Sequence, residues 1–278
     1  MRVVVTGAAG FLGRAVMGRL QATGVSCVGL SRRDVPGLRR VADYGDAPEA
    51  EVLVHLAQTN DRAAANVAGD GGMASALETV EALAAKGHRR IVYASSAALY
   101  GDGSTRPHPV TDPTTVVDAY TRTKYRSEES VLGRGGVVAR LSNLYGPGMA
   151  AGNVLGQLLA QLGRGPTITM HSLEPVRDFL WVEDAARALC RMVESDTTGV
   201  FNVATGVGTS IRELVHMALA KAGSGQSVVA LHALERPSHL VLDIAGTTAA
   251  LGWEPEVGIE EGVGELVNLM TKSERTQA

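Results

Sequence analysis

The sequence predicts an α/β fold: a doubly wound parallel sheet with a smaller α/β region towards the C-terminus. Apolar, β-branched runs alternate along the chain with segments whose apolar residues recur at helical spacing. A glycine-rich turn joins the first apolar run, residues 2–5, to the first helical segment. Such alternation is typical of a parallel sheet covered by helices on both faces, and 278 residues are enough to bury its core.

The glycine-rich turn has the sequence TGAAGFLG, residues 6–13, and leads into a helix expected over Phe11–Ala22. A tight turn needs a residue without a Cβ at Gly7, and close approach of a pyrophosphate needs one at Gly10. Packing of the helix on the strand needs one at Gly13. The free N–H groups at the start of the helix would face the phosphates. The turn therefore predicts a dinucleotide site formed by Gly7, Gly10, Phe11, Leu12 and Gly13.

The second strand is expected over residues 25–30, and the residues that follow it bear on the choice of cofactor. An acidic residue about 20 positions past the glycines would hold the ribose 2′-hydroxyl of NAD, whereas arginine can pair with the 2′-phosphate of NADP. Ser31 stands where the acid would be, and Arg32 and Arg33 follow it. This favours NADP over NAD. The alternative is that both arginines are solvated charges at a strand end.

The central part of the chain predicts three further strands and one long helix. A short third strand is expected over residues 41–43 and a clearer fourth over residues 52–56. An amphipathic helix is expected over residues 72–86, closed by Gly87, before a fifth strand at residues 90–94.

The fifth strand leads to Ser96, and a later helix carries Tyr120 and Lys124. A tyrosine and a lysine four residues apart lie on one helical face. A free tyrosine has a pKa near 10, and a nearby lysine cation would lower it towards the range of a useful general acid. Ser96 could hydrogen-bond the same substrate oxygen. These three residues are the predicted catalytic set.

Composition argues against several other classes of protein. A net charge of −3 and only 4% aromatic residues do not suggest nucleic-acid binding. Cys27 and Cys190 are expected to be buried thiols in a reducing compartment. The seven histidines show no pair at zinc-ligand spacing, so no metal is expected. With no apolar run of membrane-spanning length, the expectation is a cytoplasmic protein without a membrane partner.

Taken together, these motifs resemble the extended short-chain dehydrogenase/reductase family, of the nucleotide-sugar epimerase and ketoreductase type. The resemblance covers nearly the whole chain. The matching positions are Gly7, Gly10 and Gly13; Leu56 and Ala57, which lie against the cofactor in that family; Ser96, Tyr120 and Lys124; and residues 140–147, 177–184, 201–204 and 251–255.

The resemblance implies a division of the chain into two domains. A Rossmann dinucleotide-binding domain would comprise residues 1–145, with residues 178–204 returning to it. Residues 146–177 and 205–278 would form the substrate-binding domain. The two would enclose a cleft over the C-terminal ends of the parallel strands, where such folds bind ligands.

The resemblance also implies individual binding roles. Arg177 and Arg236 would hold the diphosphate of a nucleotide-sugar, because a planar, permanently charged guanidinium suits it. Asn143 would contact the substrate, and Asp43 would accept a hydrogen bond from the adenine amino group. Many relatives pair through two long helices, so a homodimer is a further expectation.

The predicted reaction is NADPH-dependent reduction of a ketone, with a nucleotide-linked 4-keto deoxysugar as the first choice and Tyr120 as the general acid. Dehydratases of the family place an acid and a base after the strand-end serine, where this chain has Ala97 and Ala98. The open alternatives are an NAD-dependent nucleotide-sugar 4-epimerase and a reductase of a non-sugar ketone. A cofactor-sensing regulator without turnover is disfavoured because Tyr120 and Lys124 are both present.

Overall fold

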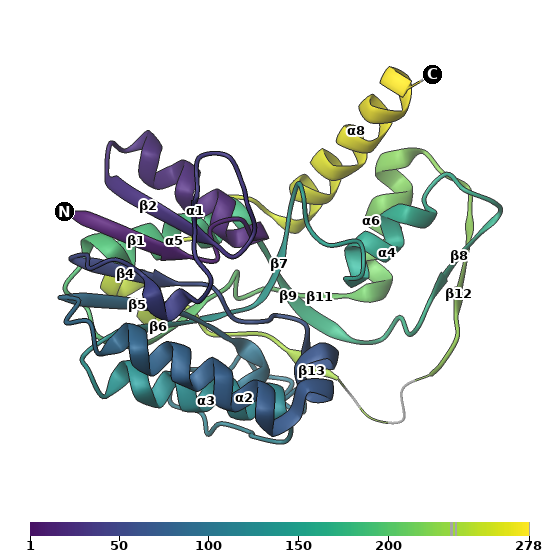
Figure 1. Cartoon of the computed structure of the whole chain (residues 1–278). Helices are drawn as coiled ribbons and strands as arrows, with labels where there is room; N and C mark the ends of the chain where they lie inside the picture. The colour runs from purple at the N-terminus through teal and green to yellow at the C-terminus, as the bar shows by residue number, and fades with distance from the viewer. Residues whose placement is uncertain (234–235, 237, 278) are drawn as a thin grey trace.

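The computed structural model describes residues 1–233, 236 and 238–277. Within them, seven parallel strands form the large sheet seen in Figure 1. In spatial order the strands are β10 (Gly199–Val203), β6 (Val137–Leu141), β5 (Arg90–Ser96), β4 (Val52–His55), β1 (Arg2–Thr6), β2 (Ser26–Ser31) and β3 (Arg39–Arg40). The order of the strands reverses between β1 and β4, which is where doubly wound sheets bind ligands. The predicted fold class is confirmed.

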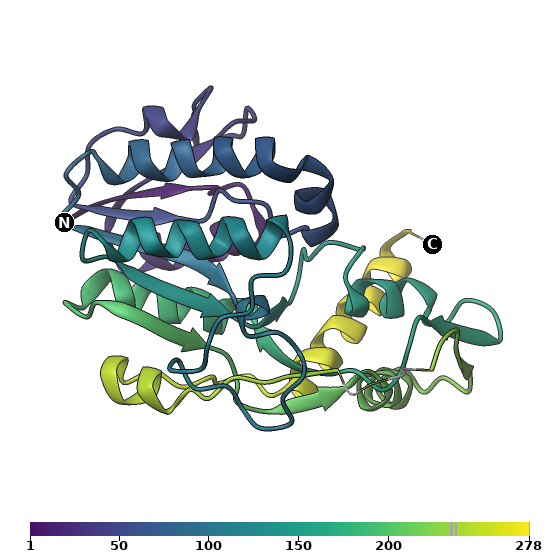
Figure 2. The same ribbon diagram turned by 90° about the horizontal axis from the view of Figure 1, so that it is seen from below.

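Helices cover both faces of this sheet (Figure 2). Val3 and Val5 of β1 pack against one layer of helices and Val4 against the other, because successive side chains of a strand alternate. All three are fully buried, which explains the uninterrupted apolar run of the first strand. No described helix is long and apolar enough to cross a membrane. One layer is formed by α1 (Phe11–Ala22) and α5 (Val182–Glu194), and the other by α2 (Arg62–Ala84) and α3 (Ala119–Leu132).

A smaller α/β region has its own hydrophobic cluster around Tyr145, Phe179 and Trp181. The Tyr145 ring meets the other two edge to face, with centroids 6.4 and 5.2 Å apart. Its elements are β7 (Asn143–Tyr145), α4 (Val154–Gln161), β8 (Thr167–Met170), β9 (Val176–Trp181), β11 (Gly208–Ser210), α6 (Ile211–Ala222), β12 (Ser227–Ala230), β13 (His239–Leu240) and α8 (Ile259–Gln277). β9 pairs with β7, β11 and β13, and β8 pairs with β12.

Part of the C-terminal segment packs back on the large sheet. α7 (Ala245–Leu251) contacts β10 and α5, and Leu251 joins the cluster beneath α1 and α5. Trp253 is fully buried in the same cluster, and its indole N–H donates to the carbonyl oxygen of Asp184 at 3.1 Å. This stretch, assigned from the sequence to the substrate-binding region, therefore also completes the core under the large sheet.

Two elements differ from the sequence expectation. The third strand is β3, and residues 41–43, which were expected to form it, follow it as irregular chain. The helix expected over residues 72–86 begins ten residues earlier, since Asp61 caps it by accepting from the Ala64 N–H at 2.9 Å. Gly69, with φ 56° and ψ −144°, breaks α2 near its first third. The glycines of α2 hid its helical pattern in the sequence.

A buried polar network fixes α3 on the sheet. Glu128 of α3 accepts two hydrogen bonds from Arg140 of β6, at 2.7 and 3.0 Å, and one from the Ser95 hydroxyl. The Arg140 guanidinium also lies 4.8 Å from the ring centroid of Tyr100, whose hydroxyl donates to Asn202 at 2.7 Å. The network joins α3, β5, β6 and β10, and so sets the position of the helix that carries Tyr120 and Lys124.

Candidate active site

The glycine turn has the shape that its sequence predicts. Gly7 has φ +69°, and a Cβ there would lie 3.0 Å from the backbone of Ala57, just after β4. A Cβ on Gly13 would lie 2.1 Å from the carbonyl oxygen of Gly7, so this glycine lets α1 pack against the turn itself. Gly10 is exposed at the N-cap of α1. The turn thus leaves bare backbone and a helix N-terminus facing a cavity, which fits a pyrophosphate.

Ser31 and the two arginines lie at the end of β2 as expected. Ser31 is buried, and its hydroxyl accepts a hydrogen bond from the Arg33 N–H at 3.0 Å. Arg32 is exposed, with its guanidinium 5.6 Å from the ring centroid of Tyr44. Arg40 of β3 pairs in register with Ser31, which adds an arginine that sequence analysis did not single out. This strand end therefore carries three arginines, Arg32, Arg33 and Arg40.

Asp43 does not lie in a strand. It caps a short 3₁₀ helix over Tyr44–Asp46, and its carboxylate accepts from the Gly45 N–H at 2.6 Å. The expectation of a strand at this point is wrong because a polar cap, rather than a β-ladder, holds the backbone. Asp43 remains exposed beside the basic strand end.

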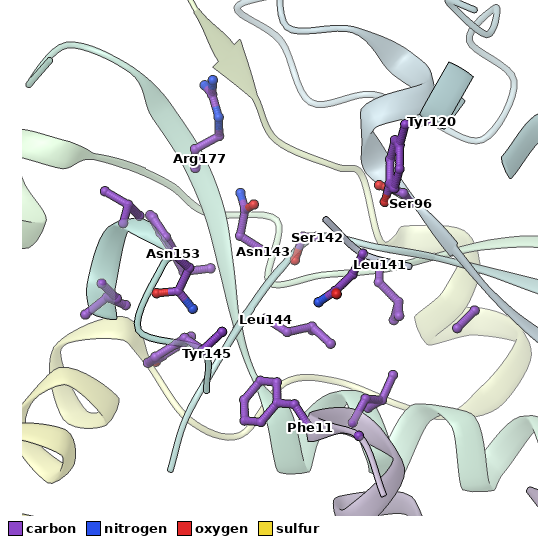
Figure 3. A pocket seen from close by; sticks show the side chains of 18 of the residues that line it. Phe11, Ser96, Tyr120, Leu141, Ser142, Asn143, Leu144, Tyr145, Asn153 and Arg177 are labelled. Atoms are coloured by element: carbon purple, nitrogen blue, oxygen red, sulfur yellow. The ribbon is translucent and has the colours of Figure 1, made fainter. Parts of the chain in front are cut away.

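Ser96 and Tyr120 lie beside each other, although they come from different elements (Figure 3). Ser96 ends β5, and its hydroxyl accepts from the Ala98 N–H at 3.2 Å. Tyr120 is buried on the first turn of α3. Burial raises the pKa of Tyr120, while the Ser96 hydroxyl and the charge of Arg62 act in the opposite direction. The expected lowering of this pKa by Lys124 is not found, because burial dominates.

Lys124 is buried one turn further along α3. Its amine donates to the carbonyl oxygen of Ala94 at 3.0 Å and lies 5.2 Å from the ring centroid of Tyr93. Burial lowers the pKa of Lys124 to about 8, against the opposing effect of Glu128. Burial, and then the charge of Lys124, lower the pKa of His55 to about 3, so this histidine is neutral at physiological pH.

Two cavities meet at the Ser96–Tyr120 pair. The first, of about 720 Å³, extends from the glycine turn past Lys124 to the smaller α/β region. The second, of about 740 Å³, lies against the loop that follows β5. Both are lined by Asn60, Ser96, Tyr120, Asn143 and Arg177. Figure 3 shows Tyr120 and Ser96 on one side, Arg177 on the opposite strand and Asn143 between them.

The two arginines expected to hold a diphosphate converge on Asp102. Arg177 lies 3.6 Å from this carboxylate and Arg236 lies 3.1 Å from it. Arg177 also donates to the Ser238 hydroxyl at 2.7 Å. Both guanidiniums line the second cavity, and Arg177 lines the first as well. The structure therefore places two arginines, with one carboxylate between them, across the cavity from Tyr120.

Sequence analysis missed several residues that line the cavities. Gln58 follows the Leu56–Ala57 pair and donates to the Ser127 hydroxyl of α3 at 2.8 Å. Asn153 accepts from the Gly156 N–H at 2.7 Å, so its sequence signal is that of a helix cap. Arg62 and Asp102 gave no signal, because only the fold brings them to Tyr120 and Arg177.

The groups at Tyr120 limit the chemistry of the site. A buried phenol, a serine hydroxyl and a lysine can move a hydroxyl proton while a dinucleotide moves a hydride. Ala97 is buried and Ala98 lines the second cavity. Neither can transfer a proton, because a methyl side chain has no ionisable group. This arrangement can therefore support hydride transfer at an alcohol or ketone carbon.

The family model described as "NAD dependent epimerase/dehydratase family" matches residues 3–204. The chain belongs to this family, which confirms the resemblance found in the motifs and agrees with a nicotinamide dinucleotide cofactor, NAD or NADP.

Individual relatives cover nearly the whole chain. It is 28% identical to a dTDP-6-deoxy-L-talose 4-dehydrogenase (NAD(P)(+)) of Kitasatospora kifunensis, over 95% of this chain and 94% of the relative. Among solved structures it resembles UDP-glucose 4-epimerase with UDP-glucose from Thermotoga maritima, with a TM-score of 0.87, 23% identity and coverage of 98% and 99%. It also resembles RMD from Pseudomonas aeruginosa complexed with NADPH, with a TM-score of 0.84, 25% identity and coverage of 96% and 97%.

Proposed function

We propose that the protein reduces the ketone of a nucleotide-linked 4-keto sugar with NADPH. The observation that carries this proposal is the first cavity, which joins the glycine turn, the Ser96–Tyr120–Lys124 set and Arg177 in one space. A dinucleotide at the turn and a sugar nucleotide at the arginine would both reach Tyr120. NADPH supplies the hydride when it is bound.

The chain's own residues carry the proton. Tyr120 gives its phenolic proton to the carbonyl oxygen as that oxygen becomes an alkoxide. Ser96, beside it, donates a hydrogen bond that orients the carbonyl (Figure 3). Lys124 adds positive charge on the same helix, and its low pKa lets it exchange a proton near neutrality. Burial of both groups excludes water from the transfer.

Binding at the two ends of the cavity supports the choice of ligands. Arg32 and Arg33 would hold the 2′-phosphate of NADP at the end of β2. Arg177 and Arg236 would hold the diphosphate of the substrate, and Asn143 its sugar. The relative named as a sugar 4-dehydrogenase supports this choice, since oxidation at C4 is the same hydride transfer run in reverse.

We assign the cofactor to residues 1–145 with 178–204 and the substrate to residues 146–177 with 205–278. The hydrophobic clusters support this division except at its boundaries. One cluster lies under the large sheet, and the other joins residues of the smaller region to Tyr145, Phe179 and Trp181 of the cofactor segments. α7 and Trp253 tie the second segment to the first cluster. The cleft between the two regions then holds the reacting atoms.

A second candidate is a nucleotide-sugar 4-epimerase that keeps NAD bound through oxidation and re-reduction. The family description, which names epimerases, favours it. The same residues would serve, with Tyr120 first taking and then returning the proton. The two candidates differ in whether the cofactor is consumed and released.

The test begins with the purified protein, examined for retained cofactor and then titrated with NADPH and NADH by fluorescence. We expect no retained NAD, tighter binding of NADPH, and loss of that preference in Arg32→Ala. Arg89→Ala, which removes an exposed arginine just before β5, should leave the preference for NADPH intact. Retained NAD, or a preference for NADH that Arg32→Ala does not change, would favour the epimerase.

Turnover is tested with nucleotide-linked 4-keto sugars, by following NADPH absorbance. Tyr120→Phe should keep NADPH binding and lose roughly a hundredfold or more in turnover, the contribution expected of general acid catalysis. Full turnover by Tyr120→Phe would exclude the proposed mechanism.

A further inference from the structure

Arg62, on the first turn of α2, reaches the active site from a part of the sequence to which no motif assigned a role. It lines the second cavity together with Ser96 and Tyr120. Its Nε donates to the carboxylate of Asp118 at 2.5 Å. Asp118 caps α3 only two residues before Tyr120. A fixed arginine and its partner carboxylate therefore lie at the start of the helix that carries the phenol.

The same part of α2 also holds the backbone of Tyr120. The side-chain oxygen of Asn66 accepts the Tyr120 N–H at 3.1 Å, and its nitrogen donates to Asp118 at 3.1 Å. Gly69 breaks α2 directly after this piece. Residues 62–68 thus form a short helical piece that makes three hydrogen bonds to the start of α3. Arg62 makes one of them and Asn66 makes the other two.

Lys124, one turn along α3 from Tyr120, is the other cation on this side of the cavity. Its amine is committed to the Ala94 carbonyl oxygen, and it is buried beside the Tyr93 ring. With a pKa of about 8, it also loses its charge in mildly alkaline solution. A guanidinium keeps its charge throughout that range.

The charged and titratable groups around Tyr120 come from four elements and from two loops, whose Asp102, His108 and Arg236 line the second cavity with it. Arg62 comes from α2, Lys124 from α3, Tyr93 from β5 and Arg177 from β9 across the cavity. Asp118 at the helix cap is the nearby carboxylate, and its charge raises the pKa of Tyr120 while that of Arg62 lowers it. Loss of Arg62 would leave the carboxylate uncompensated.

We propose that Arg62 is a positioning residue for proton transfer by Tyr120: its guanidinium neutralises Asp118, whose negative charge at the start of α3 would otherwise oppose ionisation of the phenol. The inference rests on the proposed function, because it assumes that Tyr120 carries the proton. Arg62 then adds to the electrostatic support that Lys124 gives from the same helix as Tyr120. It acts through Tyr120 and not on the substrate.

The experiment measures the ionisation of Tyr120 without any substrate. Phenolate absorbance is recorded against pH for each protein and for the same protein carrying Tyr120→Phe, and the difference belongs to Tyr120. Arg62→Gln should move this ionisation upward by about 0.5 to 1 pH unit. Arg62→Lys should restore most of the shift, because a cation returns.

Arg122→Gln is the matched control. Arg122 pairs with Asp70 at 2.8 Å, so it also joins α3 to α2, and its side chain is 46% exposed against 50% for Arg62. It lies outside the residues lining either cavity. This variant should leave the ionisation of Tyr120 unchanged. An equal shift in Arg122→Gln, or none in Arg62→Gln, would overturn the proposal.

Asp118→Asn gives a second test that does not depend on how well Arg62→Gln folds. Asparagine is also a good helix cap, so α3 keeps its start while the negative charge disappears. The ionisation of Tyr120 should then move downward. Loosening of α3 would also lower this pKa by exposing the phenol, so urea unfolding must first show that Asp118→Asn keeps wild-type stability. No shift, or an upward one, would overturn the proposal.

Steady-state kinetics separate this role from substrate binding. If Arg62 acts through Tyr120, Arg62→Gln lowers kcat and shifts its pH profile while KM changes little. A raised KM with an unchanged pH profile would make Arg62 a substrate ligand and overturn the proposal. Failure of the proposed function is a different result, namely full turnover by Tyr120→Phe.

Discussion

Replacement of Lys124 by methionine should stabilise the protein at neutral pH while removing turnover. The buried amine has a pKa of about 8, compared with about 10.4 for an exposed lysine. That difference corresponds to about 3 kcal/mol by which the folded state disfavours the charged amine. Loss of the hydrogen bond to Ala94 costs about 1 kcal/mol and loss of the contact with the Tyr93 ring somewhat less. The expected net gain is about 1–2 kcal/mol.

The difference in stability between Lys124→Met and the wild type depends on pH. Below pH 8 lysine is protonated in both the folded and the unfolded chain, so the folded wild type bears the full cost of the buried charge. Between about pH 8 and 10.4 only the unfolded chain keeps the proton, and wild-type stability rises with pH. Above about pH 10.4 the amine is neutral in both the folded and the unfolded chain, so the cost of burying its charge is gone. The advantage of Lys124→Met should therefore be largest near pH 7, vanish at about pH 9 and turn into a disadvantage by about pH 10.

Urea unfolding at both pH values measures this directly. Lys86→Met, which removes a lysine just beyond the end of α2, is the control and should show no pH-dependent gain. The reasoning is refuted if Lys124→Met is less stable than the wild type at pH 7. It is also refuted if the difference between the two proteins is the same at both pH values.

Two further pairs of variants probe the glycine turn and the buried Glu128–Arg140 network. Gly13→Ala puts a Cβ 2.1 Å from the Gly7 carbonyl oxygen, so it should lower the free energy of unfolding by about 1–3 kcal/mol and weaken NADPH binding. Gly18→Ala is the control, because its Cβ meets nothing within 4 Å, and it should stabilise the same helix by about 0.5–1 kcal/mol. Glu128→Gln should cost about 3–5 kcal/mol by leaving Arg140 buried without its carboxylate, and changing both to methionine should recover most of that loss. Urea unfolding measures all four proteins.

The parts of the fold that were predicted depend on local signals. The turn at Gly7 and Gly13 follows from steric rules that act within a few residues, and β1 follows from an apolar run buried on both faces. Tyr120 and Lys124 share a helix, so their spacing alone placed them together. The start of α2 was missed because Gly69 and its neighbouring glycines hide a helix that Asp61 caps.

The parts that were missed depend on contacts between distant segments. Arg62 meets Asp118 across 56 positions, and Asp102 meets Arg236 across 134, so no local pattern marks either pair. The pKa of Tyr120 could not be inferred from the spacing to Lys124, because it depends on burial that only the assembled fold creates.

The network that holds α3 on the sheet also controls the charge of Lys124. Glu128 lies one turn beyond Lys124 and is the carboxylate that raises its pKa, yet both of its oxygens are already bonded to Arg140. A carboxylate neutralised in this way compensates only part of the burial of the amine, which leaves the lysine close to the pH at which it exchanges protons. Glu128 thus has two effects on one helix: it anchors α3, and it raises the pKa of Lys124 against the larger effect of burial.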